Sequence, residues 1–125
     1  MIIKNISIGT DIESISRFDK YSLNRNHKLL LRIFSEQELD YCFLFRYPQT
    51  HLAARFSAKE ATIKALSYFS IKNISYKNIE VIKDFNNVPN IRILNNSLSK
   101  NIQFRLSLSH DKENSIAQVM AIELA

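Results

Sequence analysis

The hydrophobic positions of this 125-residue chain change their period partway along it. After a short predicted strand over 2–8, with Ile6 and Ile8 on one face, they recur at helical spacing up to about residue 68. Beyond that point they alternate with a period of two. The pattern predicts an α+β fold in which most helices precede most strands.

Three helices are expected in the first part. Ile12, Ile15 and Phe18 suit one face of a helix over 12–21, where Asp11 stands at a strand-to-helix junction and can serve as N-cap. A capping box at 35–38 starts a second helix, which must end before Pro48. The third and longest helix, over 50–68, alternates large hydrophobic residues with alanines, so we expect close packing on most of its sides.

Four strand candidates follow, centred on 79–81, 91–93, 104–108 and 117–121. Turn-forming residues at 86–89 and 111–114 separate members of this set. We therefore expect an antiparallel meander packed against the long helix.

Composition favours one domain covering 1–125, and this small core contains only one cysteine, Cys42, so no disulfide can form within a monomer. Oligomerisation would be a natural way to bury more surface and compensate for such a small core. The opening residues do not resemble a signal peptide, and no apolar run reaches the roughly 20 residues needed to cross a bilayer, so we expect a cytoplasmic protein without a membrane partner. The net charge of +5 suits an acidic partner but does not identify one.

Charged residues on the long helix are unusual for packing alone. Lys59 falls within its hydrophobic stripe and Glu60 at the margin, with Arg55 one turn before Lys59 and Lys64 one turn after Glu60. One interpretation is a Glu60–Lys64 salt bridge with the other two cations reaching water. The other is a polyphosphate site, in which cations hold oxygens and the carboxylate holds a metal.

A magnesium site normally uses one or two protein carboxylates. Asp11, at the end of the first strand, is the candidate second carboxylate beside Glu60. His110 closes a predicted strand before a turn, where its side chain can point into a cleft, although a solvated histidine is the commoner outcome there. Ser109 beside it carries a weaker signal.

Three segments together resemble the holo-acyl-carrier-protein synthase family of 4′-phosphopantetheinyl transferases in order and spacing. They are IGTDIESISRF at 8–18, RFSAKEATIKA at 55–65 and LSLSHD at 106–111, and FSEQELDY at 34–41 also looks like the family's next helix. The first two are specific as a pair. The resemblance spans nearly the whole chain and implies the fold of that family, an antiparallel sheet against a long central helix.

The resemblance implies roles for individual residues. Asp11 and Glu60 match the family's magnesium ligands, and Ser109 and His110 match the segment at the nucleotide end of coenzyme A. Arg17 matches the basic contact with the acidic helix of acyl carrier protein, and Lys20 extends that surface. The motif around the coenzyme A phosphates contains Arg55, Lys59 and Lys64.

The implied reaction moves phosphopantetheine from coenzyme A to a serine of acyl carrier protein, releasing 3′,5′-ADP, in fatty acid biosynthesis. Asp11, Glu60 and Lys64 would be the catalytic residues, and Lys64 is the first choice for the leaving phosphate. Glu60 itself or a water held by the metal could accept the serine proton. The family also implies a homotrimer with its sites between subunits.

Two departures from the family pattern concern loops. Ser67 and Asn87 stand where the family usually has glycine, and Val88 follows where it usually has lysine. Two other classes of protein compete with the enzyme: a basic nucleic-acid-binding domain and a purely structural protein. Scattered cations and a single glycine, Gly9, fit neither an RNA-binding sheet motif nor a glycine-rich loop, so we expect no nucleic-acid partner.

Overall fold

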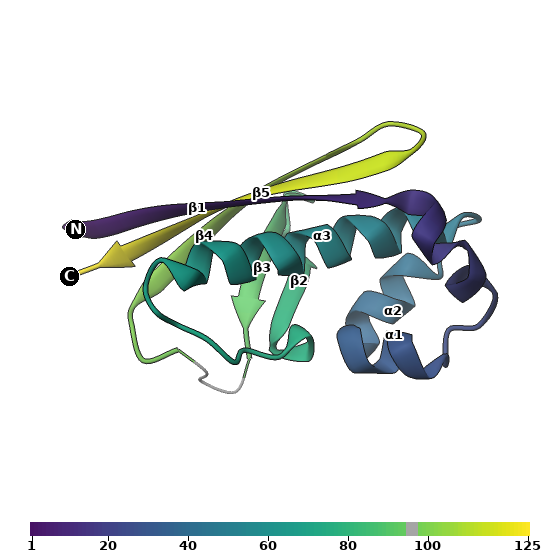
Figure 1. The fold of residues 1–125 in the computed structure, drawn as a ribbon, viewed down its shortest axis with the longest axis horizontal. Helices are drawn as coiled ribbons and strands as arrows, with labels where there is room; N and C mark the ends of the chain where they lie inside the picture. The colour runs from purple at the N-terminus through teal and green to yellow at the C-terminus, as the bar shows by residue number, and fades with distance from the viewer. Residues whose placement is uncertain (95–97) are drawn as a thin grey trace.

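The computed structural model describes residues 1–94 and 98–125, and it has one long helix lying against antiparallel strands (Figure 1). This confirms the predicted α+β class. Among the described residues, no helix is both long enough and apolar enough to cross a membrane. In chain order the elements are β1 (Ile3–Ser14), η1 (Ile15–Leu23), α1 (Lys28–Ile33), α2 (Glu36–Cys42), α3 (Pro48–Ser67), η2 (Tyr76–Asn78), β2 (Ile79–Lys83), β3 (Pro89–Ile93), β4 (Ile102–His110) and β5 (Asn114–Leu124).

The strands form two antiparallel sheets rather than one meander. β2 and β3 pair only with each other among the described residues, whereas β5 lies between β1 and β4 in the order β1-β5-β4. The predicted hairpins β2–β3 and β4–β5 are therefore confirmed, but the first strand of the chain pairs with the last. This pairing brings the two termini side by side at one end of the molecule (Figure 1).

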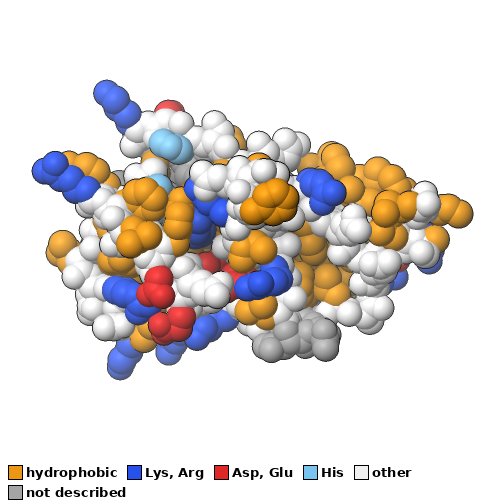
Figure 2. All heavy atoms as spheres, turned by 180° about the vertical axis from the view of Figure 1, so that it is seen from behind, with side chains coloured by type: hydrophobic (Ala, Val, Ile, Leu, Met, Phe, Trp, Pro, Cys, Tyr) orange, Lys and Arg blue, Asp and Glu red, His pale blue; other side chains and the backbone are white. Residues whose placement is uncertain are grey.

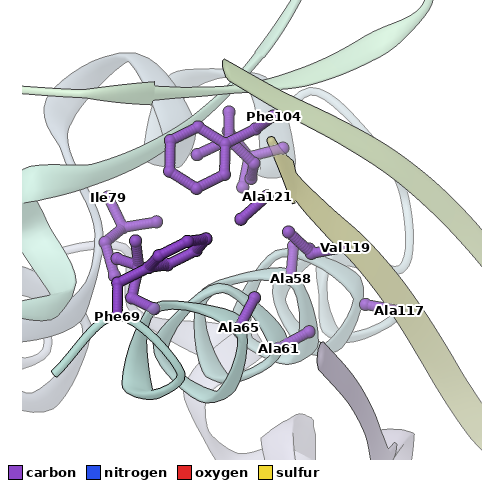
Figure 3. Packing of buried hydrophobic residues seen from close by; sticks show 12 residues of the cluster. Ala58, Ala61, Ala65, Phe69, Ile79, Phe104, Ala117, Val119 and Ala121 are labelled. Atoms are coloured by element: carbon purple, nitrogen blue, oxygen red, sulfur yellow. The ribbon is translucent and has the colours of Figure 1, made fainter. Parts of the chain in front are cut away.

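The main core lies between α3 and β5. Ala58, Ala61 and Ala65 of the helix meet Ala117, Val119 and Ala121 of the strand, with Phe104 and Phe69 closing the cluster (Figure 3). Small side chains on both elements let the helix lie close to the sheet. The prediction of a closely packed alanine-rich helix is confirmed.

The helix and the sheet approach each other closely at Gly9 on β1. A Cβ at this position would lie 1.9 Å from the carbonyl oxygen of Ala61 and 2.7 Å from the nitrogen of Ala65. Only a residue without a side chain fits there. β1 therefore lies directly on the backbone of α3, and residues near Gly9 on the same face of β1 are directed toward the helix.

The segment after Gly9 differs from the prediction. β1 continues to Ser14, which pairs with Asn114, so the expected helix over 12–21 is a 3₁₀ helix that starts only at Ile15. The ladder with β5 overrides the helical spacing. Asp11 consequently lies within the strand and is not a helix N-cap, which corrects one interpretation of that residue.

The other helices mostly follow the sequence. Ser35 and Glu38 form the predicted capping box, and α3 starts slightly early because Pro48 fits the first helical position. α1 was not predicted.

The turn at Asn87 keeps a left-handed φ of 64°, which asparagine tolerates better than most residues, so it adopts a conformation that normally favours glycine.

Candidate active site

The site begins with the inner face of β1. Ser7 and Gly9 on this face are buried, and Asp11 and Glu13 are partly buried. Successive residues of a strand alternate between faces, so all four are directed toward α3. The strand thus carries two carboxylates to the helix at the point where Gly9 lets the backbones meet.

Asp11 has one oxygen engaged and one free. Its Oδ1 accepts a hydrogen bond from Nζ of Lys64 at 3.1 Å, and the same ammonium donates to the carbonyl of Thr10 at 3.0 Å. The side chain is only 11% exposed. Its buried Oδ2 has no hydrogen-bond partner among the described residues. A buried carboxylate oxygen without a partner is costly, and a bound cation would satisfy it.

Glu60 lies on α3 one turn before Lys64 and is partly buried. Its Oε1 accepts a hydrogen bond of 2.8 Å from the hydroxyl of Tyr76, and burial followed by this bond raises the pKa of Tyr76 to about 12. Lys64 pairs with Asp11 across the helix–strand contact. The interpretation of the helix charges as a Glu60–Lys64 salt bridge is therefore wrong.

Glu13 was missed by the sequence reasoning. Its carboxylate accepts a 2.9 Å bond from Nη1 of Arg17 and also interacts with Asp11. Burial is the main cause that raises the pKa of Glu13 to about 7, helped by the neighbouring carboxylate of Asp11 and opposed by Arg17. Its spacing of two residues from Asp11 places both side chains on one face only because β1 continues to Ser14, which the predicted strand over 2–8 did not indicate.

The residues of this site fit a magnesium ion. Asp11 offers a free oxygen, Glu60 offers a second carboxylate, and both are the hard oxygen ligands that Mg²⁺ prefers. No group of three or more His, Cys, Asp or Glu side chains suited to a metal occurs within residues 1–94 and 98–125. A two-carboxylate site is normal for Mg²⁺, which completes its octahedron with water and substrate phosphate.

Lys59 does not join this site. It is fully buried, and its Nζ donates to Oε1 of Glu38 at 2.8 Å, to the carbonyl of Tyr76 at 2.8 Å and to the carbonyl of Ile79. An ammonium has three N–H groups, so none remains for a phosphate. The structure thus contradicts the interpretation of Lys59 as a coenzyme A contact and as a cation reaching water.

Arg55 lies in a second region of the molecule, a cleft of about 230 Å³. Ser109 and His110 line the same cleft, so the structure brings these three predicted residues together. Arg55 is buried, its guanidinium lies 4.0 Å from the ring centroid of Tyr41, and its Nε has no partner among the described residues. The N–H group at Nε of Arg55 is therefore available to donate a hydrogen bond to a ligand.

The charge around this cleft is positive. Lys83 and His51 also line it, and the pKa of His51 is lowered first by its burial and then by the charges of Arg55 and Lys83. Histidine side chains lie beside Lys and Arg on the face seen in Figure 2. Cations with an unpaired donor suit a phosphate ligand.

The cleft and the carboxylate site are on different sides of α3. Arg55 and Glu60 are five residues apart, which turns their side chains by about 140° around the helix axis. Asp11 on β1 and Ser109 on β4 are likewise separated by β5. A single chain therefore presents the two halves of the predicted site in separate places.

Arg17 and Lys20, the predicted docking residues, lie on η1 beside the carboxylate site. The side chain of Arg17 is 62% exposed despite its pairing with Glu13, and Lys20 lies over the ring of Tyr21. A cavity of about 320 Å³ opens next to Arg17 and is lined largely by aromatic and aliphatic side chains, namely Phe18, Tyr21, Leu29, Ile33, Phe56 and Tyr76.

The outer face of the sheet β1-β5-β4 carries exposed apolar pairs on β1 and β5. Ile8 lies opposite Met120 and Ile12 opposite Ile116 in the β1–β5 ladder, and all four side chains are exposed. Hydrophobic side chains also gather toward the end of the molecule that carries the termini (Figure 2). The polar pair of Thr10 and Gln118 lies between these two apolar pairs, so the exposed apolar residues alternate with polar ones along the face.

Comparison with known proteins agrees with the geometry. The model of the 4′-phosphopantetheinyl transferase superfamily matches residues 7–119. The holo-[acyl-carrier-protein] synthase of Clostridium tetani is 35% identical over 117 residues, which cover 90% of this chain and 91% of that protein.

Solved structures give the same result. The holo-(acyl-carrier-protein) synthase of Bacillus anthracis in complex with CoA (3′,5′-ADP) has a TM-score of 0.75 at 30% identity, covering 95% of this chain and 96% of its own. The Helicobacter pylori holo-[acyl-carrier-protein] synthase in complex with coenzyme A has a TM-score of 0.74 at 29% identity, covering 94% and 99%. The resemblance read from the sequence is confirmed, and the chain belongs to the 4′-phosphopantetheinyl transferase superfamily.

Proposed function

We propose that this chain is a holo-[acyl-carrier-protein] synthase. It transfers the 4′-phosphopantetheine group of coenzyme A to a serine hydroxyl of apo-acyl carrier protein and releases 3′,5′-ADP. The observation that supports this best is the buried, unpartnered Oδ2 of Asp11, which lies where β1 meets the helix carrying Glu60 and Lys64. The relatives named as such synthases supply the reaction.

Asp11 and Glu60 would hold the Mg²⁺ ion. When bound, Mg²⁺ supplies charge neutralisation at the pyrophosphate oxygens as the reaction proceeds. The serine oxygen forms a bond to the β-phosphorus, and the bond from that phosphorus to the bridging oxygen breaks, so the electron pair leaves with 3′,5′-ADP. Lys64, which is half-exposed beside Asp11, stabilises the negative charge on the departing phosphate. The serine proton passes to a base in the carboxylate site.

The nucleotide end of coenzyme A binds in the cleft of Arg55, Ser109 and His110. Its cations and the unpaired Nε of Arg55 suit the phosphates of that end. Because one subunit presents cleft and carboxylates on different sides of α3, the complete site combines the carboxylates of one subunit with the cleft of a neighbour. A homotrimer built on the outer face of the sheet, with its exposed apolar pairs on β1 and β5, would create such sites.

Acyl carrier protein docks on η1. Arg17 and Lys20 attract its acidic helix, and the apolar cavity beside Arg17 offers a seat for a hydrophobic side chain. The surface adjoins the carboxylate site, so a docked carrier presents its serine there. Two expectations stay predictions. One is that the reaction takes place in the cytoplasm, and the other is that a single domain over 1–125 carries the whole activity.

The test is mass spectrometry of apo-acyl carrier protein incubated with this chain and coenzyme A. We expect the carrier to gain the mass of one phosphopantetheine only when both the chain and Mg²⁺ are present, and excess chelator should prevent the gain. If several carrier proteins gain no mass and coenzyme A does not bind, the proposal is wrong. Salt-dependent binding to arbitrary DNA or RNA would then support the nucleic-acid-binding class.

A further inference from the structure

Tyr76 is held at both ends by consecutive residues of α3. Its backbone carbonyl accepts a 2.8 Å hydrogen bond from Nζ of Lys59, and its hydroxyl donates a 2.8 Å hydrogen bond to Oε1 of Glu60. The first of these helix residues is fully buried in the core, and the second is a proposed metal ligand. Tyr76 thus connects the core to the carboxylate site.

The backbone end of this connection is firmly anchored. Lys59 also donates to Glu38 and to the carbonyl of Ile79, and Oε2 of Glu38 accepts a 2.9 Å bond from the nitrogen of Val81. Each donor of the ammonium is therefore used within the protein. The chain from η2 into β2 is tied to α3 and to the start of α2 by buried, charge-assisted bonds, which are stronger than neutral ones.

The side-chain end is equally constrained. The ring of Tyr76 packs against the ring of Phe56, with centroids 5.4 Å apart, so the hydroxyl has little freedom around Glu60. The bond occupies Oε1 of the carboxylate. Oε2 is then left to a cation, and the hydrogen bond favours one orientation of the carboxylate before any ligand arrives.

We propose that Tyr76 is a positioning residue for the metal ligand Glu60, and that the buried Lys59–Glu38 pair acts on the site through Tyr76 rather than through a phosphate. The inference rests on the proposed metal role of Glu60. Ligating carboxylates are commonly oriented by such hydrogen bonds, and loss of an orienting partner typically lowers metal affinity about tenfold or more.

Tyr76→Phe tests this directly because it keeps the ring contact with Phe56 and removes only the hydroxyl. The matched control is Tyr68→Phe, since Tyr68 is exposed and its hydroxyl lies 3.5 Å from Asn5, away from the carboxylates. The full-length proteins are titrated with Mn²⁺ in the presence of coenzyme A, and free Mn²⁺ is followed by electron paramagnetic resonance. Transfer rates are measured in parallel over a range of Mg²⁺ concentrations.

We expect Tyr76→Phe to weaken Mn²⁺ binding about tenfold relative to wild type. Its transfer rate should fall at limiting Mg²⁺ and recover at high Mg²⁺, with the KM for the carrier protein and the Tm both close to those of Tyr68→Phe. Equal Mn²⁺ affinity in the two variants would overturn the inference while leaving the proposed function intact. A rate loss that is the same at every Mg²⁺ concentration would also overturn it.

The same titration separates the two levels of the proposal. A wild-type protein that transfers phosphopantetheine but binds no Mn²⁺ would contradict the metal role of Glu60 and with it the role of Tyr76. A wild-type protein that neither binds Mn²⁺ nor transfers the group would overturn the proposed function itself.

Discussion

The two faces of β1 have opposite characters. The inner face, against α3, carries Ser7, Gly9, Asp11 and Glu13, whereas the outer face carries isoleucines that are exposed in the single chain. A strand with one buried face normally places its hydrophobic residues inward. The inversion fits an inner face that approaches α3 closely and carries the proposed chemistry, and an outer face that contacts the other subunits of the proposed trimer.

Replacing Gly9 should cause the largest loss of stability on the inner face of β1. In Gly9→Val the new side chain would overlap the backbone of α3 at Ala61, so either the strand or the helix must move. We expect a loss of about 3 kcal/mol or more in the free energy of unfolding. Urea denaturation measures it, with Thr10→Val on the exposed neighbour as control. Equal stability of the two variants would contradict the close packing of β1 on α3.

A charge on the outer face should disrupt association without unfolding the subunit. Ile8 is 57% exposed in the single chain, and Ile8→Lys would put a cation into an apolar interface. We expect sedimentation velocity to show a trimer for wild type and monomers for Ile8→Lys. Leu44→Lys is the control because Leu44 is exposed outside the sheet. A monomeric wild type, or a trimeric Ile8→Lys, would contradict the role given to this face.

Arg17 sits at the edge of the inner face, where docking and chemistry meet. Arg17→Glu reverses a charge that should attract the acidic helix of the carrier protein, so we expect the KM for acyl carrier protein to rise about tenfold, a loss of roughly 1.4 kcal/mol. The affinity for coenzyme A should not change. Steady-state kinetics measures this effect, and Lys72→Glu provides the same charge change elsewhere. An unchanged KM would remove Arg17 from the docking surface.

Glu13 should make the stability of the folded protein depend on pH. Its pKa is raised to about 7 in the folded protein from an ordinary value of 4.5, mainly by burial. Between these values the folded state binds more protons than the unfolded state, so metal-free wild type loses stability as the pH rises from about 4.5 to about 7.

Glu13→Gln removes this titration. Urea denaturation of metal-free wild type and variant at pH 5 and pH 8 should therefore show a larger loss in wild type at the higher pH. Parallel changes in the two proteins would mean that Glu13 titrates normally. The comparison with the variant is needed because other carboxylates also titrate in the range.

Local patterns in the sequence predicted much of the fold. The capping box at Ser35, the alanine-rich long helix and the two hairpins depend on short-range spacing, and the structure confirms them. The pairing of β1 with β5 joins residues 100 or more positions apart. That ladder extends β1 to Ser14 and removes Asp11 from a helix cap, and no local pattern indicates it.

The partners of the charged residues of α3 also could not be predicted from local patterns. Lys59 and Lys64 both belong to the motif that predicted a phosphate site, yet Lys64 lies beside Asp11 and Lys59 is buried against Glu38. Helical spacing correctly placed Lys59 in the hydrophobic stripe. Its partners come from α2 and from the chain at 76–79, which the spacing of α3 cannot reveal. Tyr76 was not predicted as a site residue for the same reason.

The most direct test of the account is the transfer rate of Asp11→Asn, which keeps the shape of the side chain on the inner face and removes its charge. We expect the rate to fall by about 100-fold or more, with Mn²⁺ binding weakened and stability retained, while Asp19→Asn on the exposed side of η1 behaves like wild type. Transfer by Asp11→Asn at the wild-type rate and Mg²⁺ dependence would contradict the assignment of the inner face of β1 as the site of the chemistry.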